Sequence, residues 1–275
     1  MIESECFLPR WVGGASGSTP ERCASPCGGL KKVAMNSDLP LADVGFHGAI
    51  LNLVSISIAQ RTCEIDLCLG DWKVGKPRPA SLFAFTDMAS FFGRFDFQEL
   101  ADNARAGNVQ DGAVDAAGTR LRMHLVGGML EAVAGTIGLR ALGCSHAGRG
   151  STAFADGRRP RPDAGAELTS LEPLDRVDLD LSHLEEIQLS AVDSICRLVM
   201  QVRTSSNVLQ RAPATITFKG VTSCVVHLDI EKLAAERPYG NVIGGHVDVA
   251  RGLVRLHLSE GFIEIGGRSA SLVWR

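Results

Sequence analysis

The chain has 275 residues, a formal net charge of −3 at pH 7 and 45% hydrophobic residues. This balance is typical of a folded globular protein and argues against a disordered one. There is no basic excess of the kind that nucleic-acid binding needs, and no apolar run approaches the roughly 20 residues that cross a bilayer. The acidic start does not resemble a signal peptide, so we expect a cytoplasmic protein with neither a nucleic-acid nor a membrane partner.

The most informative feature of the sequence is an internal repeat. A shift of 133 residues aligns "AGNVQDGAVD" at 106–115 with "YGNVIGGHVD" at 239–248. The match extends without a gap from 37–142 to 170–275, with about 26 identities over about 106 positions, roughly four times what chance gives. We therefore predict two β domains, one over 37–142 and one over 170–275.

Two segments outside the copies have the composition of unstructured chain. Residues 1–36 are rich in Gly, Ser and Pro, and residues 143–169 add a short basic patch at Arg158, Arg159 and Arg161. We predict a disordered N-terminal tail over 1–36 and a flexible linker over 143–169.

Eight cysteines are scattered along the chain, which in a cytoplasmic protein favours reduced thiols over a disulfide framework. Cys23 and Cys27 could hold a metal only with two further ligands, and no histidine stands close by. We expect neither a metal nor another cofactor. Cys63 and Cys196 occupy the same position in the two copies, where core packing is the expected role.

In the first copy, alternating apolar and polar residues predict strands over 50–59, 63–69 and 80–85. The third of these places Phe83 and Phe85 on one face. Their counterparts in the second copy are also apolar, so the same face is expected to be buried in both copies.

The period changes at Asp96. From there to Gly107 the residues predict a short helix, with Asp96 as its N-cap, Glu99 reaching back and Gly107 ending the helix in the left-handed conformation. Alternation returns over 109–116, 119–125 and 129–139, which predicts three further strands. Each copy thus has about six strands with one short helix before the fourth.

This content excludes a parallel α/β fold, which needs far more helix. The predicted fold is mainly β, a tandem duplication of an antiparallel β-sandwich-like domain or curved sheet.

The Gly-Asn-Val motif at Gly107, Asn108 and at Gly240, Asn241 could cradle an anion through backbone N–H groups. However, it closes a helix and opens a strand, whereas nucleotide-binding loops follow a strand and open a helix. Helix capping and a turn explain these residues without a ligand, so we interpret them as structural turns.

The stretches "RMHLVGGMLE" and "RLHLSEGFIE" hold the candidate binding surface. Each predicts a tight hairpin. In the first copy, a two-residue turn at Gly127 and Gly128 places His124 opposite Glu131, with Arg122 on the same face.

The second copy repeats this cluster as Arg255, His257 and Glu264. A His-carboxylate pair can act as a general base or supply part of a metal site. No nucleophile elbow and no second histidine at ligand spacing accompanies it. A cross-strand charge pair on the wet face of a sheet is also common and contributes only about 0.2 to 1 kcal/mol. The cluster is therefore a structural pair, a binding surface or part of a catalytic site.

"VGFHGAILNLVSISIAQRTCEIDLCL" at 44–69 resembles the opening of small bacterial β domains that begin Phe-His-Asp-Ala, with Gly48 in place of the aspartate. The second copy's "ITFKGVTSCVVHLD" at 216–229 is similar to the third strand of those domains. Some of them are immunity proteins of polymorphic-toxin systems. The resemblance implies a β fold and a role in binding and blocking a partner toxin.

These observations favour a non-enzymatic two-domain β protein that binds a macromolecule, in the first place a protein. The two copies could engage one target bivalently, could add a strand from a partner, or could pack face to face as an intramolecular pseudo-dimer. The alternative is a small-molecule or metal-dependent enzyme that uses Arg122, His124 and Glu131 or their counterparts.

Overall fold

The computed structural model describes residues 41–69, 80–104, 106–142, 171, 174, 177–204, 210–235 and 240–274. The predicted tail and linker lie outside these residues. Residues 35–275 form one compact unit, so both predicted copies belong to the same body.

The first half of the body contains η1 (Leu41–Asp43), β1 (Ile50–Ser57), β2 (Thr62–Cys68), β3 (Ala80–Asp96), α1 (Phe97–Asp102), β4 (Val109–Val114), β5 (Arg120–Leu125) and β6 (Gly128–Leu142). The second half contains β7 (His183–Ser190), β8 (Ile195–Arg203), β9 (Arg211–Lys219), β10 (Ser223–Asp229), α3 (Ile230–Ala235), β11 (Val242–Asp248), β12 (Leu253–Leu258), β13 (Gly261–Gly266) and β14 (Ser269–Trp274). The mainly β, antiparallel character predicted from the sequence is confirmed.

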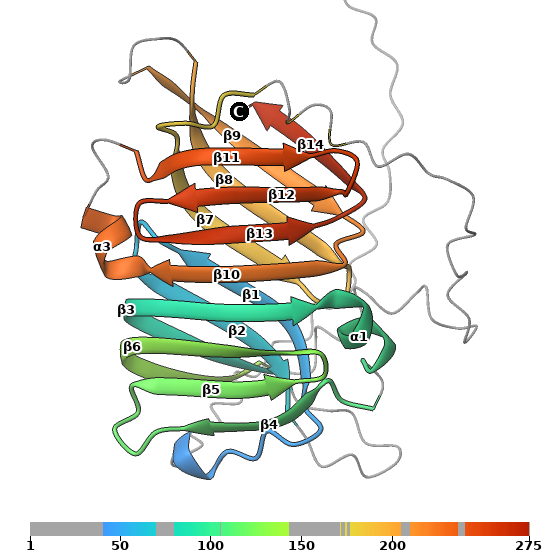
Figure 1. Ribbon diagram of the computed structural model, residues 1–275. Coiled ribbons are helices and arrows are strands. Elements are labelled where there is room, and N and C mark those ends of the chain that lie inside the picture. Colours follow the sequence, from blue (N-terminus) through green and yellow to red (C-terminus); the bar gives the residue numbers. More distant parts are fainter. Residues whose placement is uncertain are drawn as a thin grey trace, which may run out of the picture. The chain divides into compact units, whose positions relative to one another are not determined.

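Two layers of strands are visible in Figure 1. The front sheet has the order β4-β5-β6-β3-β10-β13-β12-β11, and the back sheet has the order β6-β3-β2-β1-β7-β8-β9-β14. Strands β3 and β6 run through both sheets, because β3 pairs with β2 up to Thr86 and with β10 from Ser90 onward. This makes the two sheets one continuous hydrogen-bonded surface folded over a common core.

Strand β3 extends well beyond the predicted end at residue 85. Its corner is at Asp87, which has φ of 55°, and the register with β6 shifts between Met88 and Ser90. An irregularity of this kind bends a strand without ending it. The second half bends at the equivalent Gly220, with φ of 60°, and there the strand is interrupted to give β9 and β10.

The halves join edge to edge at two places, β1 with β7 and β3 with β10, both antiparallel. At the first junction Leu53 pairs with Ser190, Ser57 with Glu186, and Ser55 with Gln188. These pairs are reciprocal under the 133-residue shift. Leu53 corresponds to Glu186, which pairs with Ser57, and Ser57 corresponds to Ser190, which pairs with Leu53. The face-to-face packing considered above is therefore not the arrangement; the junctions have the reciprocal pairing of a two-fold dimer interface.

The β3–β10 junction obeys the same rule. Ser90 pairs with Asp229, Asp96 with Ser223, and Gly93 with Val226, its own counterpart. A two-fold axis that relates the paired strands of each junction therefore passes through the middle of that junction, at Ser55 with Gln188 and at Gly93 with Val226.

Backbone conformation also corresponds between the halves. Four pairs of residues with positive φ are 133 apart: Asp87 and Gly220 at the bend, Arg61 (53°) and Ser194 (52°), Gly48 (73°) and Leu181 (60°), and Gly107 (114°) and Gly240 (88°). Four other glycines with positive φ, Gly118, Gly127, Gly252 and Gly261, have no such counterpart. A left-handed backbone is uncommon for residues other than glycine, so its recurrence at arginine, serine and leucine indicates that local geometry is imposed by the fold.

A single apolar cluster fills the space between the sheets and draws on both halves. It contains the predicted inward residues Phe83 and Phe85 and their counterparts Ile216 and Phe218, each no more than 1% exposed. The alternation read from the sequence therefore identified the buried face correctly.

Helix α1 begins as predicted, because the Asp96 carboxylate accepts hydrogen bonds from the backbone N–H groups of Gln98 and Glu99, both at 3.0 Å. Its predicted end is wrong. The helix stops at Asp102, and the Asn103 side chain donates to the Glu99 carbonyl at 2.8 Å. An asparagine that bonds back to the last turn ends the helix before Gly107 is reached.

Candidate binding surface

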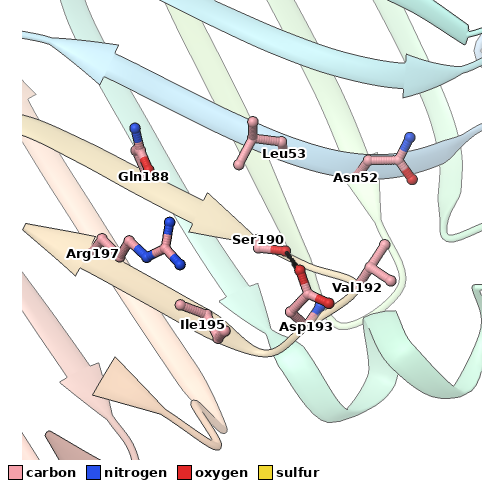
Figure 2. Close-up of a pocket in the computed structure, with 8 residues that line it drawn as sticks. All are labelled: Asn52, Leu53, Gln188, Ser190, Val192, Asp193, Ile195 and Arg197. Carbon is pink, nitrogen blue, oxygen red and sulfur yellow. Dashed lines mark hydrogen bonds between the residues drawn. The ribbon is translucent and has the colours of Figure 1, made fainter. Parts of the chain in front are cut away.

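A hollow of about 330 Å³ lies on the outward side of the back sheet, where β1, β7 and β8 meet (Figure 2). None of the site residues singled out from the sequence lines it. Those residues lie instead on two hairpins of the front sheet, β5–β6 and β12–β13.

The predicted pairing within the first hairpin is wrong, because the turn lies one residue earlier than predicted and each residue of β5 pairs two residues earlier on β6. Leu125 pairs with Gly128, His124 with Met129, and Arg122 with Glu131. The turn therefore consists of Val126 and Gly127, and His124 is not opposite the glutamate.

The observed register is explained by the neighbouring strand β3. A Cβ on Gly128 would stand 2.0 Å from the Arg94 carbonyl oxygen, so glycine is required for the close approach of β3 and not for the turn. In the second hairpin, a Cβ on Gly261 would stand 2.0 Å from the His227 carbonyl oxygen. Pairing with a strand from another part of the chain sets the register.

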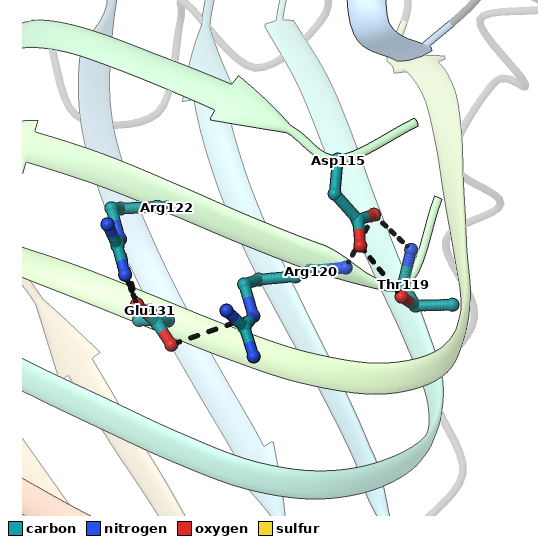
Figure 3. A network of polar contacts seen from close by, with 5 residues as sticks. All are labelled: Asp115, Thr119, Arg120, Arg122 and Glu131. Atoms are coloured by element: carbon teal, nitrogen blue, oxygen red, sulfur yellow. Dashed lines mark hydrogen bonds and ion pairs between the residues drawn. The ribbon is translucent and has the colours of Figure 1, made fainter. Parts of the chain in front are cut away.

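Arg122 and Glu131 form a close ion pair on the outward face (Figure 3). The Arg122 Nε donates to Glu131 Oε2 at 2.8 Å, a terminal guanidinium nitrogen lies 2.6 Å from the same oxygen, and Arg120 Nε lies 3.8 Å from Oε1. About half of the Arg122 side chain (52%) is exposed. Two guanidinium groups thus share one carboxylate, which leaves the group net positive.

The second hairpin repeats the pair. Arg255 lies opposite Glu264, and its Nε donates to Glu264 Oε2 at 2.8 Å, with a second contact from the guanidinium. His257 pairs with Phe262, as His124 pairs with Met129. Within the described part of the chain, neither histidine ring has a hydrogen-bond or ion-pair partner.

An aromatic row connects the two hairpins across the β3–β10 junction. The ring centroids of Phe92 and His227 are 6.1 Å apart and those of His227 and Phe262 are 5.9 Å apart, both in edge-to-face geometry. These residues lie on paired strands and alternate with buried neighbours, so they point to the same outward side as Arg122 and Arg255. Sequence reasoning did not find this row because its members come from three strands of both halves.

We refer to this outward side of the front sheet as the front face. It comprises Asp111, Arg120, Arg122, His124, Met129, Glu131, Phe92, Arg94, Val225, His227, Phe262, Glu264, Arg255, His257 and His246. Half-buried aromatic side chains with arginines around them are typical of protein-binding surfaces.

The Gly-Asn motifs have an internal role. Asn108 is 1% exposed, and its amide oxygen accepts from the Leu51 N–H at 2.7 Å while its nitrogen donates to the Leu51 and Leu100 carbonyls. Asn241 binds Leu184 in the same way, at 2.7 and 3.0 Å. Each amide replaces a missing backbone partner, which supports the interpretation of these motifs as structural turns.

The preceding glycines allow the same contact. Gly107 has φ of +114°, and a Cβ there would lie 2.3 Å from the Gly48 carbonyl oxygen; Gly240 has φ of +88° and meets the Leu181 carbonyl oxygen at 2.3 Å. No other residue type fits either position without displacing the backbone.

The paired cysteines Cys63 and Cys196 belong to the core and not to a reactive site. Cys63 and Cys196 are free and buried, and burial raises the pKa of both thiols well above its usual range. A thiol held in its neutral form is a poor nucleophile. Among the described residues there is no group of three or more acidic, histidine or cysteine side chains with the arrangement of a metal site, and Cys23 and Cys27 lie outside them.

The arrangement does not favour the alternative of an enzyme that uses the hairpin cluster. His124 is separated from its expected carboxylate partner, and the six candidate side chains are exposed or half-exposed on a sheet face. A general base works through a positioned proton transfer in a site that holds the substrate, whereas these six side chains lie on the outward side of a sheet.

No protein-family model, curated protein or solved structure matches the chain. None of the described helices has the length and apolar character required to cross a membrane.

Proposed function

We propose that this chain is an internally duplicated, non-enzymatic β protein that binds a protein partner through its front face. The duplication is supported by the aligned identities, by the paired left-handed residues and by the reciprocal registers at both junctions.

The observation that carries the binding proposal is a difference between the two outward surfaces. On the front face, three exposed or half-exposed residues recur at equivalent positions: Arg122 with Arg255, His124 with His257, and Glu131 with Glu264. On the outward side of the back sheet, the described equivalent positions of the strands differ in residue type except for the serine pair Ser57 and Ser190.

A contribution to folding stability does not by itself explain why the same arginine, histidine and glutamate occur in both halves. An exposed Arg-Glu pair contributes about 0.2 to 1 kcal/mol, and an exposed histidine without a partner contributes less. A use for the surface itself, repeated in both halves, is the better explanation, since exposed polar residues are kept for binding more than for folding.

A protein is the partner class that fits this surface. The half-buried aromatic row supplies apolar area that a partner can cover, and the arginines can form paired hydrogen bonds with carboxylates around it. The resemblance to immunity domains makes a toxin the partner that we propose in particular.

The test uses the full chain, immobilised and exposed to a lysate of the organism that encodes it. A front-face variant carries Arg122→Ala, His124→Ala, Arg255→Ala and His257→Ala. We expect capture of the partner to weaken at least about 30-fold, since central interface residues each contribute on the order of 2 kcal/mol. The melting temperature is expected to change little, because all four side chains are exposed.

The matched control changes the same number of exposed residues on the back sheet away from the hollow, as Glu64→Ala, Thr86→Ala, Arg140→Ala and Lys219→Ala. Capture should then be unchanged. A partner that is lost with the control and retained by the front-face variant would contradict the proposal.

A photo-crosslinking amino acid supplies a direct readout of contact. Placed at Met129 on the front face it should crosslink to the captured partner, and placed at Thr217 on the back sheet it should not. If the partner is a toxin, its expression alone should arrest growth, and coexpression with this chain should restore it.

A further inference from the structure

The hollow on the back sheet is formed at the β1–β7 junction. Ser190 is its floor, because this small residue is paired with Leu53 on one side and Ile195 on the other. The two larger apolar side chains form walls on either side of it (Figure 2). A small residue between two larger ones on adjacent strands leaves an open space above the sheet.

The turn between β7 and β8 closes one end of the hollow. Ser190 Oγ donates to Asp193 Oδ2 at 2.7 Å and accepts from the Asp193 N–H at 3.3 Å, while the Ala191 N–H donates to the Asn52 carbonyl at 3.0 Å. The turn is thereby fixed to both β7 and β1, and its shape does not depend on a ligand.

Arg197 stands at the other end, beside Gln188. Its side chain is exposed and has no ion-pair or hydrogen-bond partner in the described part of the chain. The neighbouring carboxylates are engaged elsewhere. Glu186 accepts from Ser55 Oγ at 3.1 Å and from Gln188 Nε2 at 2.8 Å, and Asp193 is bonded to the floor serine.

The opposite end of the same junction shows that this chemistry is not a by-product of the fold. The positions there that correspond to the hollow hold other residues: Glu186 corresponds to Leu53, Ser57 to Ser190, Thr62 to Ile195 and Glu64 to Arg197. The backbone and the floor serine are kept, and Ser57 accepts from the Gln60 N–H at 3.2 Å as Ser190 does from Asp193.

The walls and the charge, in contrast, are not kept. One end of the junction is apolar with a free guanidinium, and the other is polar and acidic. A 330 Å³ hollow is within the size range of small-ligand sites, and such sites combine apolar walls with a few oriented polar groups.

We propose that this hollow binds an apolar molecule that ends in a carboxylate. The apolar body lies over Ser190 between Leu53 and Ile195, and the carboxylate accepts paired hydrogen bonds from the Arg197 guanidinium. Asp193 at the far end disfavours the reverse orientation by repulsion between like charges. A free organic acid and the C-terminus of a peptide share this chemistry.

The test is a titration of the full chain with 4-phenylbutyrate, followed through the methyl NMR signals of Leu53 and Ile195. Saturable shifts are expected at both residues. The neutral 4-phenylbutyramide should bind at least about tenfold more weakly, since a charge-assisted bidentate pair is lost. Equal binding of the amide, or no saturable shift with the acid, would overturn the proposal.

Variants at corresponding positions of the two ends of the β1–β7 junction provide the controls. Arg197→Gln should weaken 4-phenylbutyrate binding about tenfold or more, and Ser190→Val should abolish it by filling the floor. Glu64→Gln and Ser57→Val make the matched changes at the other end and should leave binding unchanged. If the matched pairs have equal effects, the hollow is not the site.

A second arm distinguishes the two sources of the carboxylate. A tetrapeptide that ends in leucine is compared with the same peptide carrying a C-terminal amide. Tighter binding of the free-acid peptide than of 4-phenylbutyrate assigns the hollow to protein C-termini, and the reverse order assigns it to small organic acids. Either order supports the carboxylate site.

Discussion

The two halves of the body have helices and strands at corresponding positions but differ in many of the side chains, including those at the junctions where the halves meet. On the inward side of the β3–β10 junction, the first half contributes Phe91, Gly93 and Phe95. The second half contributes Cys224, Val226 and Leu228 at the equivalent positions, all of them fully buried.

Two of the three inward pairs place a larger residue opposite a smaller one, and the third, Phe91 with Leu228, joins two large residues. Phe95 pairs with Cys224, and Gly93 with Val226. A Cβ on Gly93 would lie 2.5 Å from the Phe95 ring and 2.9 Å from the Phe91 ring, so glycine makes room for both rings. Around Gly93, a change in the size of one residue therefore alters the space available to its neighbours. The backbone correspondence, in contrast, includes positions with the same residue in both halves, such as Gly107 and Gly240.

The largest expected effect concerns the glycines that head β6 and β13. We expect Gly128→Ala and Gly261→Ala each to cost about 4 kcal/mol or more, because the new Cβ would meet a backbone carbonyl oxygen at 2.0 Å. Gly261, with φ of +139°, should be the more sensitive of the two. Urea unfolding monitored by circular dichroism measures both. An effect below about 1 kcal/mol in either half would break the correspondence between the hairpins.

The buried asparagines come next. Asn108→Ala and Asn241→Ala should each cost about 3 kcal/mol, because each leaves buried backbone groups of Leu51 or Leu184 without a partner. The same unfolding experiment applies. Similar costs in the two halves support a shared framework. A cost at only one position would show that the turns have diverged in role as well as in sequence.

The junction residues test the effect of residue size around Gly93. Gly93→Ala should cost about 2 kcal/mol through overpacking, and Val226→Ala should cost about 2 kcal/mol through loss of packing. The double variant should cost less than the sum by about 0.5 kcal/mol or more, since the second change gives the phenylalanine rings room to move. Strict additivity would indicate that the two positions adapt independently.

The smallest effect concerns the β4–β5 turn. The Asp115 carboxylate accepts from the Arg120 and Thr119 N–H groups at 3.0 and 2.7 Å, and from the Thr119 hydroxyl at 2.9 Å (Figure 3). These hydrogen bonds, the one from Arg120 first, hold the pKa of Asp115 below its usual range. Asp115→Asn should therefore lower the melting temperature slightly at neutral pH.

The sign of the pH dependence follows from the lowered pKa. The carboxylate's contribution is present above the unfolded-state pKa of roughly 3.9 and is lost as the pH falls through the lower folded-state pKa. The difference in melting temperature between wild type and Asp115→Asn should be constant above about pH 5 and shrink in acid. Asp248→Asn is the matched change in the second half, where the carboxylate accepts from the Arg251 N–H at 3.0 Å. A difference that grows in acid would contradict this account of Asp115.

The local features of the fold could be predicted from the sequence, because alternation and capping are encoded within short stretches. The inward placement of Phe83 and Phe85 and the Asp96 cap are examples. The hairpin register could not be predicted, because Gly128 is required by the Arg94 carbonyl on a strand distant in the sequence.

The same limit applies to the surfaces. The candidate residues of the hairpins were found because they recur in both copies. The aromatic row and the hollow were missed because neither is formed by one segment. Leu53 and Ser190, which pair across the hollow, have no shared motif that would connect them in the sequence.

The two junctions also determine when the chain can finish folding. Strands β1 and β3 are made early in synthesis, but their partners β7 and β10 follow about 130 residues later. At roughly 5 to 20 residues per second, the first half has two unpaired strand edges for on the order of ten seconds. Unpaired edges readily accept strands from other chains. For this protein, the speed of translation through the second half therefore determines how long each new molecule remains exposed to aggregation.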